Sequence, residues 1–215
     1  MTPASVPDLE IEPVGLPDAG RRAPLSDIPG VVLFTPARHS DERGFFSETF
    51  RLDAFRERVG EVALVQENHS LTRRRGSIRG LHCQAPPRAQ GKLMRVTRGA
   101  VFDVVVDARR GSPTFGRHAT VELSAENWRQ LWAPPGLLHG FCTLTDDVEF
   151  LYRVTDYYSP EHDRAVAYDD PALGIAWPRF DGPPLLSAKD RLGRPFSELE
   201  HMFPADAAPI GLRRA

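Results

Sequence analysis

The chain has 215 residues, which is enough for one large domain with a substantial buried core. Hydrophobic residues make up 41% of the sequence and charged residues 26%, and the formal net charge is -2 at pH 7. This ordinary globular composition gives no support for nucleic-acid binding, which usually needs a clustered basic face. No apolar run approaches membrane-spanning length, and the N-terminus lacks a secretory signal pattern. We therefore expect a cytoplasmic protein that binds neither nucleic acid nor membrane.

The first 27 residues are rich in proline, glycine and alanine and show no hydrophobic periodicity. They predict an N-terminal extension that is loosely ordered or lies across a partner. From residue 28 the chain becomes a series of short β-rich runs separated by turn residues. Residues 52–59 predict a short helix, because their apolar positions are spaced three and four apart. The expected strands cover residues 31–34, 44–50, 62–70, 77–84, 92–97, 100–107, 118–123, 129–133, 137–144 and 148–155.

Short strands at regular spacing indicate an all-β sandwich or barrel, and no strand–helix alternation favours a doubly wound sheet. Several prolines after residue 159 break the pattern, and a weak helix is expected within residues 189–201. We therefore expect one domain over residues 28–190, followed by a C-terminal segment over residues 191–215. Cys83 and Cys142 lie in apolar strand-like sequence, which predicts buried free thiols in a reducing compartment.

Three polar side chains share a strand face with large apolar residues, because side chains alternate between the two faces of a strand. They are Lys92, His139 and Tyr152. Each residue type on a strand is more often structural than functional when it occurs alone. Burying an unpaired lysine in a dry core is costly, whereas a sheet that encloses a ligand cavity has a partly polar interior. The recurrence of such residues therefore favours a ligand cavity.

Arg79, His82 and Lys92 bring an imidazole and two cations into one short stretch of the chain. A histidine beside fixed cations suits proton abstraction from a carbon next to a carbonyl group, because the cations stabilise the anion that forms. Strict alternation places Arg79 and His82 on opposite faces of their strand. A β-bulge at Gly80 would turn Arg79 inward.

The sequence does not support a catalytic metal site. Metal-binding double-stranded β-helices supply two histidines one residue apart, then a carboxylate and a later histidine. Here Gln84 stands two positions after His82, and the next acidic residue is Asp103. Only His139 fits the pattern. The chain also lacks a Gly-x-Ser-x-Gly nucleophile motif and a phosphate-binding glycine loop.

The chain resembles the dTDP-4-dehydrorhamnose 3,5-epimerase family over residues 28–190. The resemblance rests on motifs that occur in order: DERGFF at 41–46, QENHS at 66–70, RGLHCQ at 79–84, SPTFG at 112–116, LSAEN at 123–127, PGLLHGF at 135–141 and LSAKD at 186–190. It implies a cupin-like jelly roll, or double-stranded β-helix, with short peripheral helices and no metal or other cofactor. It also implies a homodimer in which strands are shared between subunits.

By this resemblance, the protein inverts carbons 3 and 5 of dTDP-4-dehydro-6-deoxy-D-glucose to give dTDP-4-dehydro-L-rhamnose, in dTDP-L-rhamnose biosynthesis. His82 matches the general base, Asp190 the carboxylate that orients it, Tyr152 the opposing acid and Lys92 the cation near the ketone oxygen. Further positions are expected to bind the substrate, some of them in the neighbouring subunit: Arg43, Phe46, Glu48, Gln66, Asn68, Arg79, His139, Tyr157 and Lys189.

Three other functions stay open at the level of sequence. Related enzymes that invert a single carbon, in other deoxysugar pathways, can retain the same histidine, aspartate and tyrosine. A non-catalytic nucleotide-sugar binding module would share the binding residues. A metal-dependent cupin oxygenase would need the second histidine that this sequence lacks. The N-terminal extension and the segment after residue 190 run beyond the compact pattern of the family.

Overall fold

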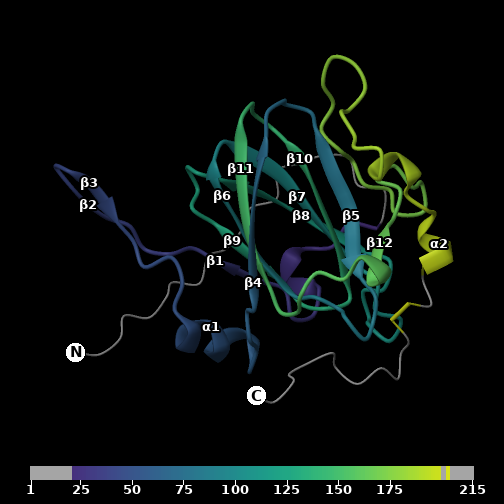
Figure 1. Ribbon diagram of the computed structural model, residues 1–215, viewed down its shortest axis with the longest axis horizontal. Helices are drawn as coiled ribbons and strands as arrows, with labels where there is room; N and C mark the ends of the chain where they lie inside the picture. Colours follow the sequence, from purple (N-terminus) through teal and green to yellow (C-terminus); the bar gives the residue numbers. More distant parts are fainter. Residues whose placement is uncertain (1–20, 200–201, 204–215) are drawn as a thin grey trace.

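The computed structural model describes residues 21–199 and 202–203 of the chain. Ten of its strands form two antiparallel five-stranded sheets that pack face to face (Figure 1). Sheet I has the order β1 (Val32–Phe34), β9 (Gln130–Ala133), β6 (Lys92–Arg98), β11 (Val148–Val154) and β4 (Gln66–Thr72). Sheet II has the order β12 (Asp163–Ala165), β5 (Ile78–Gln84), β10 (Leu137–Thr143), β7 (Ala100–Asp107) and β8 (His118–Ser124).

Strands that follow one another in the chain lie in alternate sheets at most connections. This arrangement is the jelly roll, and it confirms the predicted all-β fold with short peripheral helices. The main core lies between the sheets, where Met94 and Phe150 of sheet I pack with Val101, Val105 and Phe141 of sheet II.

The outer faces of the two sheets are covered differently. Helix α1 (Leu52–Val59), found where it was predicted, inserts Phe55 against Trp132 and Leu93 on the outside of sheet I. The outside of sheet II is covered by residues that follow β12, including Leu173 and Phe196. Hydrophobic clusters of the described residues therefore lie between the two sheets and on the outer face of each.

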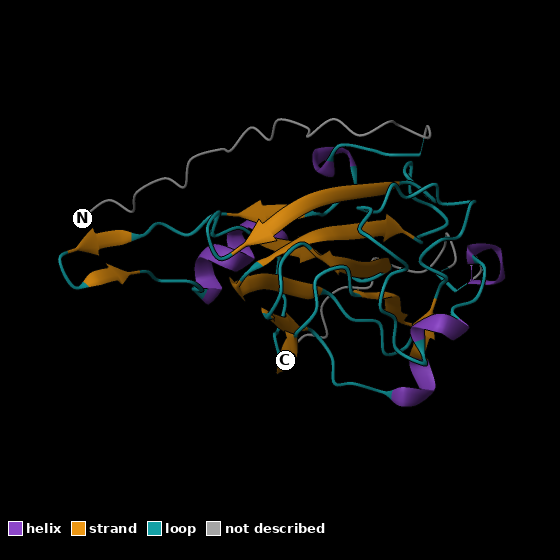
Figure 2. Cartoon of the chain, turned by 90° about the horizontal axis from the view of Figure 1, so that it is seen from above, coloured by secondary structure: helices purple, strands orange, loops and turns teal. Residues whose placement is uncertain are grey.

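The two-stranded hairpin of β2 (His39–Asp41) and β3 (Gly44–Phe46) projects away from the sheets (Figure 2). Its six strand residues are all exposed. The sequence predicted one strand over residues 44–50 after a polar turn. The polar residues instead form the first strand and the turn, which the Asp41 carboxylate caps by accepting a hydrogen bond from the Arg43 N–H at 2.9 Å.

The strand predicted over residues 62–70 is shifted toward the C-terminus, since β4 covers Gln66–Thr72. Short elements that were not predicted are a further difference. They are the 3-10 helices Leu25–Asp27, Pro160–His162 and Asp190–Leu192, the short helix α2 (Phe196–Leu199) and strand β12. The last two helices replace the single weak helix predicted near the C-terminus. Most of the N-terminal extension lies outside the described residues, but Ala23 at its end is buried in the core. Both cysteines are buried free thiols, as predicted.

No helix in the described part of the chain is long and apolar enough to cross a membrane.

Candidate active site

A bulge in β5 brings Arg79 and His82 onto the same face of sheet II. His82 lies opposite His139 on β10, and Arg79 lies opposite Phe141, so three steps along β5 match two steps along β10. The extra residue is accommodated at Gly80, which has a φ of 122° and lies against Gly140. The predicted bulge is confirmed by this register shift, and Arg79 reaches sheet I, where its Nε donates a hydrogen bond to Thr72 Oγ1 at 2.9 Å.

His82 forms a close pair with Asp190. The His82 Nε2 and Asp190 Oδ1 atoms are 2.6 Å apart, with the carboxylate shielded at 3% exposure and the imidazole reachable at 27%. The two atoms are not aligned as a conventional hydrogen bond, and neither has another such partner among the described residues. At this distance the carboxylate stabilises the imidazolium once the ring has gained a second proton. Asp190 also accepts a hydrogen bond from Ser187 Oγ at 2.6 Å, which fixes its second oxygen.

Burial sets the protonation states of this pair. Desolvation lowers the pKa of His82 below its ordinary value, and the Asp190 carboxylate offsets only part of that effect. Burial acts to raise the pKa of Asp190, but the contacts with His82 and Ser187 outweigh it and hold that pKa below its ordinary value. A neutral imidazole beside an ionised carboxylate is the state that a general base requires.

Lys92 reaches from sheet I to sheet II. Its Nζ donates a hydrogen bond to the backbone carbonyl of His82 at 3.3 Å. Burial lowers the pKa of this lysine, and the Asp103 carboxylate partly opposes the effect. The contact places a cationic donor next to the strand that carries His82.

Tyr152 lies on β11 in sheet I, which faces the sheet that carries His82. It packs against the main core, and burial raises the pKa of its phenol. The phenol therefore keeps its proton at neutral pH. The charge of Arg79 acts to lower that pKa and the charge of Asp163 to raise it, so both residues lie near the phenol.

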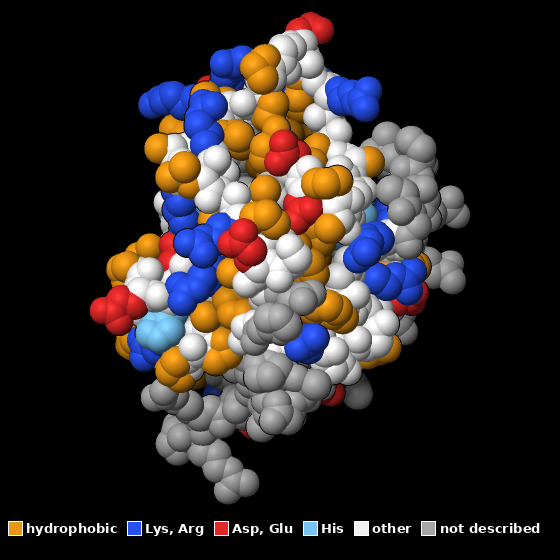
Figure 3. Space-filling view, turned by 90° about the vertical axis from the view of Figure 1, so that its right-hand side faces the viewer, with side chains coloured by type: hydrophobic (Ala, Val, Ile, Leu, Met, Phe, Trp, Pro, Cys, Tyr) orange, Lys and Arg blue, Asp and Glu red, His pale blue; other side chains and the backbone are white. Residues whose placement is uncertain are grey.

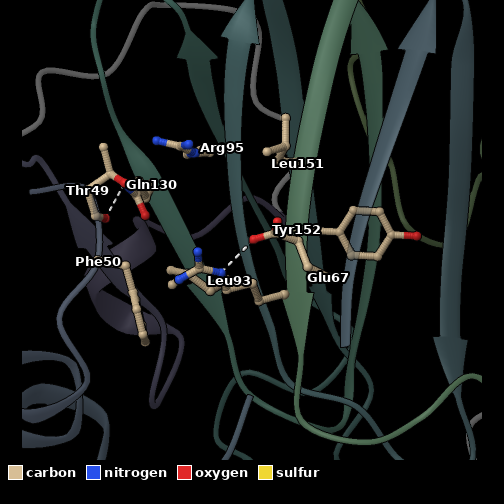
Figure 4. A pocket seen from close by; sticks show the side chains of 9 residues that line it. Thr49, Phe50, Glu67, Leu93, Arg95, Gln130, Leu151 and Tyr152 are labelled. Carbon is tan, nitrogen blue, oxygen red and sulfur yellow. Dashed lines mark hydrogen bonds and ion pairs between the residues drawn. The ribbon is translucent and has the colours of Figure 1, made fainter. Parts of the chain in front are cut away.

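A separate surface pocket lies on the outer face of sheet I, lined by Phe50, Leu93, Arg95 and Leu151 among others. Figure 4 shows that the Tyr152 ring points away from these side chains, toward the opposite face of the sheet. Tyr152 also lines this outer pocket, but its ring lies on the inner face of sheet I, the face turned toward the sheet of His82.

A second buried pair lies beside His82. The His139 Nε2 atom is 2.9 Å from Asp103 Oδ2, and His139 stacks on Phe150 with ring centroids 5.9 Å apart. The sequence singled out His139 but missed Asp103, which looks like an ordinary member of a valine-rich strand. A carboxylate on the inward face of that strand, facing a histidine, was the available signal.

The predicted binding residues on sheet I and the following loop come together. Gln66 donates to Asn68 Oδ1 at 2.9 Å and accepts a hydrogen bond from the Tyr158 N–H at 3.0 Å. Tyr157 is 58% exposed in the same loop, and Gln84 donates to its carbonyl oxygen at 3.3 Å. Lys189 pairs with Asp163 at the edge of sheet II.

The remaining three predicted binding residues lie elsewhere. Arg43 and Phe46 are in the projecting hairpin and Glu48 follows it, so the fold does not bring them to His82 of the same chain (Figure 2). Arg43 pairs with Asp41, and Phe46 is 73% exposed. Within the described ranges, no group of three His, Cys, Asp or Glu side chains is arranged to hold a metal ion.

The jelly roll carries a histidine paired with an aspartate at one sheet and a lysine and a tyrosine on the other, which is a set of groups suited to proton transfer. The family model described as dTDP-4-dehydrorhamnose 3,5-epimerase matches residues 26–198. The chain therefore belongs to the dTDP-4-dehydrorhamnose 3,5-epimerase family.

Individual relatives agree with this assignment. A dTDP-4-dehydrorhamnose 3,5-epimerase from Pseudomonas aeruginosa is 52% identical over 174 residues, covering 80% of this chain and 94% of the relative. An epimerase structure from Legionella pneumophila in complex with dTDP-4-keto-L-rhamnose is 43% identical, with a TM-score of 0.76 over 79% of this chain and 89% of the other. ChmJ, a 3'-monoepimerase from Streptomyces bikiniensis, is 40% identical, with a TM-score of 0.77 over 84% and 91% of the two chains.

Proposed function

We propose that His82, Lys92 and Tyr152 carry out the family's 3,5-epimerase reaction in this protein. The enzyme is a dTDP-4-dehydrorhamnose 3,5-epimerase of dTDP-rhamnose biosynthesis, as near 50% identity to such enzymes over 80% of the chain indicates. Its substrate is dTDP-4-dehydro-6-deoxy-D-glucose, inverted on both sides of the ketone. The observation that supports the residue roles is the 2.6 Å pair of His82 and Asp190, with Lys92 of the facing sheet in contact with the His82 carbonyl oxygen.

His82 acts first, as the base that removes a proton from the carbon next to the ketone. The neutral imidazole accepts the proton, and Asp190 stabilises the imidazolium that results. The electrons move onto the ketone oxygen and form an enolate. Lys92 supplies positive charge to that oxygen, and a preplaced donor of this kind is worth about 3–4 kcal/mol in the transition state.

Tyr152 completes the inversion by returning a proton to the opposite face of the carbon. A base and an acid on facing sheets suit this outcome, because a single group would return the proton to the face from which it came. The raised pKa of Tyr152 keeps its phenol protonated and ready to donate. His82 then gives its proton to solvent and Tyr152 takes one from solvent, after which the same two groups act on the carbon at the other side of the ketone. No cofactor takes part in these steps.

The nucleotide end of the substrate is held by residues farther along the cavity. Gln66, Asn68 and Tyr157 form its wall near the base, while Arg79 and Lys189 bind the diphosphate through charge-assisted hydrogen bonds. His139 contacts the sugar beside His82. Binding at these groups keeps the reacting carbons in register with the base and the acid. We place the enzyme in the cytoplasm, where free thiols such as Cys83 and Cys142 stay reduced.

Isotope exchange tests the reaction. In deuterium oxide, the enzyme should incorporate deuterium at both carbons 3 and 5 of the substrate, and His82→Asn should lower both rates by about 10²–10⁴-fold. Incorporation at one carbon would instead indicate a single-carbon epimerase, which the similarity to ChmJ makes the second candidate. Binding of dTDP without exchange would indicate a nucleotide-sugar binding module. Folded wild-type protein without any exchange would contradict both enzymatic proposals.

The projecting hairpin supports a homodimer with shared strands. Arg43, Phe46 and Glu48 cannot serve His82 of their own chain, so we propose that they complete the nucleotide site of a second copy. Such an exchange is isologous, because each copy contributes its hairpin to the site of the other.

Complementation between two inactive variants tests this arrangement. Coexpressed Arg43→Ala and His82→Asn chains should form mixed dimers in which one site has an intact base and an intact borrowed hairpin. About a quarter of all sites should then be active if the chains pair at random. Activity of the mixture no greater than that of the separate variants would contradict the exchange, provided that native mass spectrometry detects the mixed dimer.

A further inference from the structure

Asp190 is carried by a short segment that is fixed by backbone hydrogen bonds at both ends. Residues 186–193 form this segment, the Asp190 strap. Leu185, just before it, exchanges backbone hydrogen bonds with the residues that lead into β5, at 3.0 and 3.1 Å. Arg194, just after it, does the same with the residues around the end of β12, at 2.9 and 3.0 Å. The strap therefore spans the edge of sheet II between two fixed points.

Asp163 holds the middle of the strap through its side chain. One carboxylate oxygen of Asp163 pairs with the Lys189 ammonium group and also accepts a hydrogen bond from the Tyr158 hydroxyl at 3.0 Å. The Asp163 side chain is only 12% exposed. Asp163 itself sits on β12, whose backbone pairs with β5, so the carboxylate is a rigid anchor.

The anchor at Asp163 is connected to both members of the His82–Asp190 pair. Lys189 precedes Asp190 in the chain, and β12 places Ala165 opposite His82. A displacement of Lys189 would therefore move Asp190 relative to the imidazole. Figure 3 shows this side of the molecule, where acidic and basic side chains are interspersed with hydrophobic ones rather than grouped by sign.

We infer that Asp163 is a positioning residue for the proton-transfer reaction: it binds Lys189 and Tyr158 and thereby fixes Asp190 against His82. The inference rests on the base and carboxylate roles proposed above for His82 and Asp190. Asp163 acts through the strap and takes no proton from the substrate. Its partner Tyr158 links the same anchor to the loop of Tyr157, so one carboxylate sets both the catalytic strap and a wall of the nucleotide site.

Removal of the Asp163 charge should make His82 harder to protonate. The charged groups around His82 are Asp190 and Lys189 from the strap and Lys92 from β6, with the His139–Asp103 pair on β10 and β7 beside it. Without Asp163, Lys189 is no longer neutralised and Asp190 is held less firmly. Both changes disfavour the imidazolium, so they move the acidic limb of the rate profile to lower pH.

Asp163→Asn tests the inference, because asparagine keeps the size of the side chain and still accepts the Tyr158 hydrogen bond. We expect kcat for deuterium exchange to fall about tenfold, or about 1.4 kcal/mol of barrier, with KM changing less than about threefold. The acidic limb should move to lower pH, and Asp163→Glu should recover most of kcat. Glu198→Gln is the matched control, since it breaks the Arg194–Glu198 pair near the strap without touching Asp163.

A double-mutant cycle checks that Asp163 acts through Lys189. In a Lys189→Met background, Asp163→Asn should lower kcat by less than about threefold further, because the contact is already lost. An unchanged kcat and acidic limb in Asp163→Asn, or a lower melting temperature with an unshifted limb, would overturn the inference. So would a rise in KM alone, which would make Asp163 a substrate contact. Loss of exchange in the wild-type enzyme would instead contradict the proposed function.

Discussion

His82 is subject to two opposing influences, burial and the charge of Asp190. Burial favours the neutral imidazole in the resting enzyme, whereas the carboxylate favours the imidazolium once a proton has arrived. The residue is therefore uncharged when it must accept a proton and stabilised when it holds one. This combination explains why the base needs a shielded carboxylate rather than a solvated one.

The pH dependence of the reaction follows from the lowered pKa of His82. The base works only when neutral, so kcat/KM should fall as the pH drops through its pKa. We expect the acidic limb below the ordinary histidine value of 6.5. The negative charge of Asp190 raises the pKa of His82. Its removal in Asp190→Asn should therefore move the acidic limb to a still lower pH. A wild-type limb at or above 6.5, measured with saturating and limiting substrate, would contradict the assignment.

Tyr152→Phe should separate proton removal from inversion. Without the phenol, His82 can still remove the proton and return a solvent-derived one to the same face. We therefore expect deuterium to enter substrate that keeps its configuration, while inversion slows by about 10²–10⁴-fold. Mass spectrometry of recovered substrate and chromatography of product measure the two rates. Equal losses in both rates would argue against an acid role for Tyr152.

At the scale of elements, the bulge in β5 depends on the absence of side chains at two crossing glycines. A Cβ at Gly80 would lie 2.6 Å from the Gly140 Cα, and one at Gly140 would lie 2.9 Å from the Arg79 carbonyl oxygen. Neither backbone can yield without separating β5 from β10. The pairing that aligns Arg79 with His82 is thus fixed by steric fit.

Gly80→Ala should destabilise the protein more than Gly44→Ala. Both glycines have a strongly positive φ, at 122° and 131°, but a Cβ at Gly44 meets nothing within 4 Å. Backbone strain alone costs about 1–3 kcal/mol, and overpacking at Gly80 adds about 1–3 kcal/mol. Denaturant unfolding measures the difference. Equal losses of stability would show that steric contact with Gly140 does not limit the bulge.

The elements differed in how well the sequence predicted them. The bounds of long strands such as β7 and β10 were predicted to within one residue, because their apolar runs are too long to form a turn. The strands β2 and β12 were missed because each has only three residues, mostly polar, which is too short a run to show alternation. The roles of Asp103 and Asp163 were missed for a related reason: their partners, His139 and Lys189, are distant in sequence and are set by register and by the strap.

At the scale of the whole molecule, stability and catalysis share the outer layer of sheet II. The segment after β12 covers that sheet and also carries Asp190. The sequence separated residues 191–215 from the main domain, yet Phe196 and Phe203 are buried against sheet II. Loss of packing in this layer should therefore disturb the catalytic pair as well as the fold.

Leu173→Ala should show this coupling. Leu173 is fully buried in the outer layer, so its truncation should cost about 2–5 kcal/mol of unfolding free energy. We also expect a lower kcat below the unfolding temperature, because the layer positions the strap. Leu192→Ala, at a side chain that is 79% exposed, is the control and should leave stability unchanged. A destabilised Leu173→Ala enzyme with normal kcat would show that the layer does not transmit its packing to Asp190.

The late position of the Asp190 strap in the chain has a consequence for synthesis on the ribosome. Every strand of both sheets, and with them His82, Lys92 and Tyr152, precedes the strap in the sequence. A domain generally folds as a unit during synthesis. A nascent chain that ends before the strap therefore has the base without its carboxylate, and sheet II without Phe196 on its outer face. Both the fold and the catalytic pair are completed only after the strap and the residues behind it have been translated, so chains terminated before the strap are inert towards the nucleotide sugar.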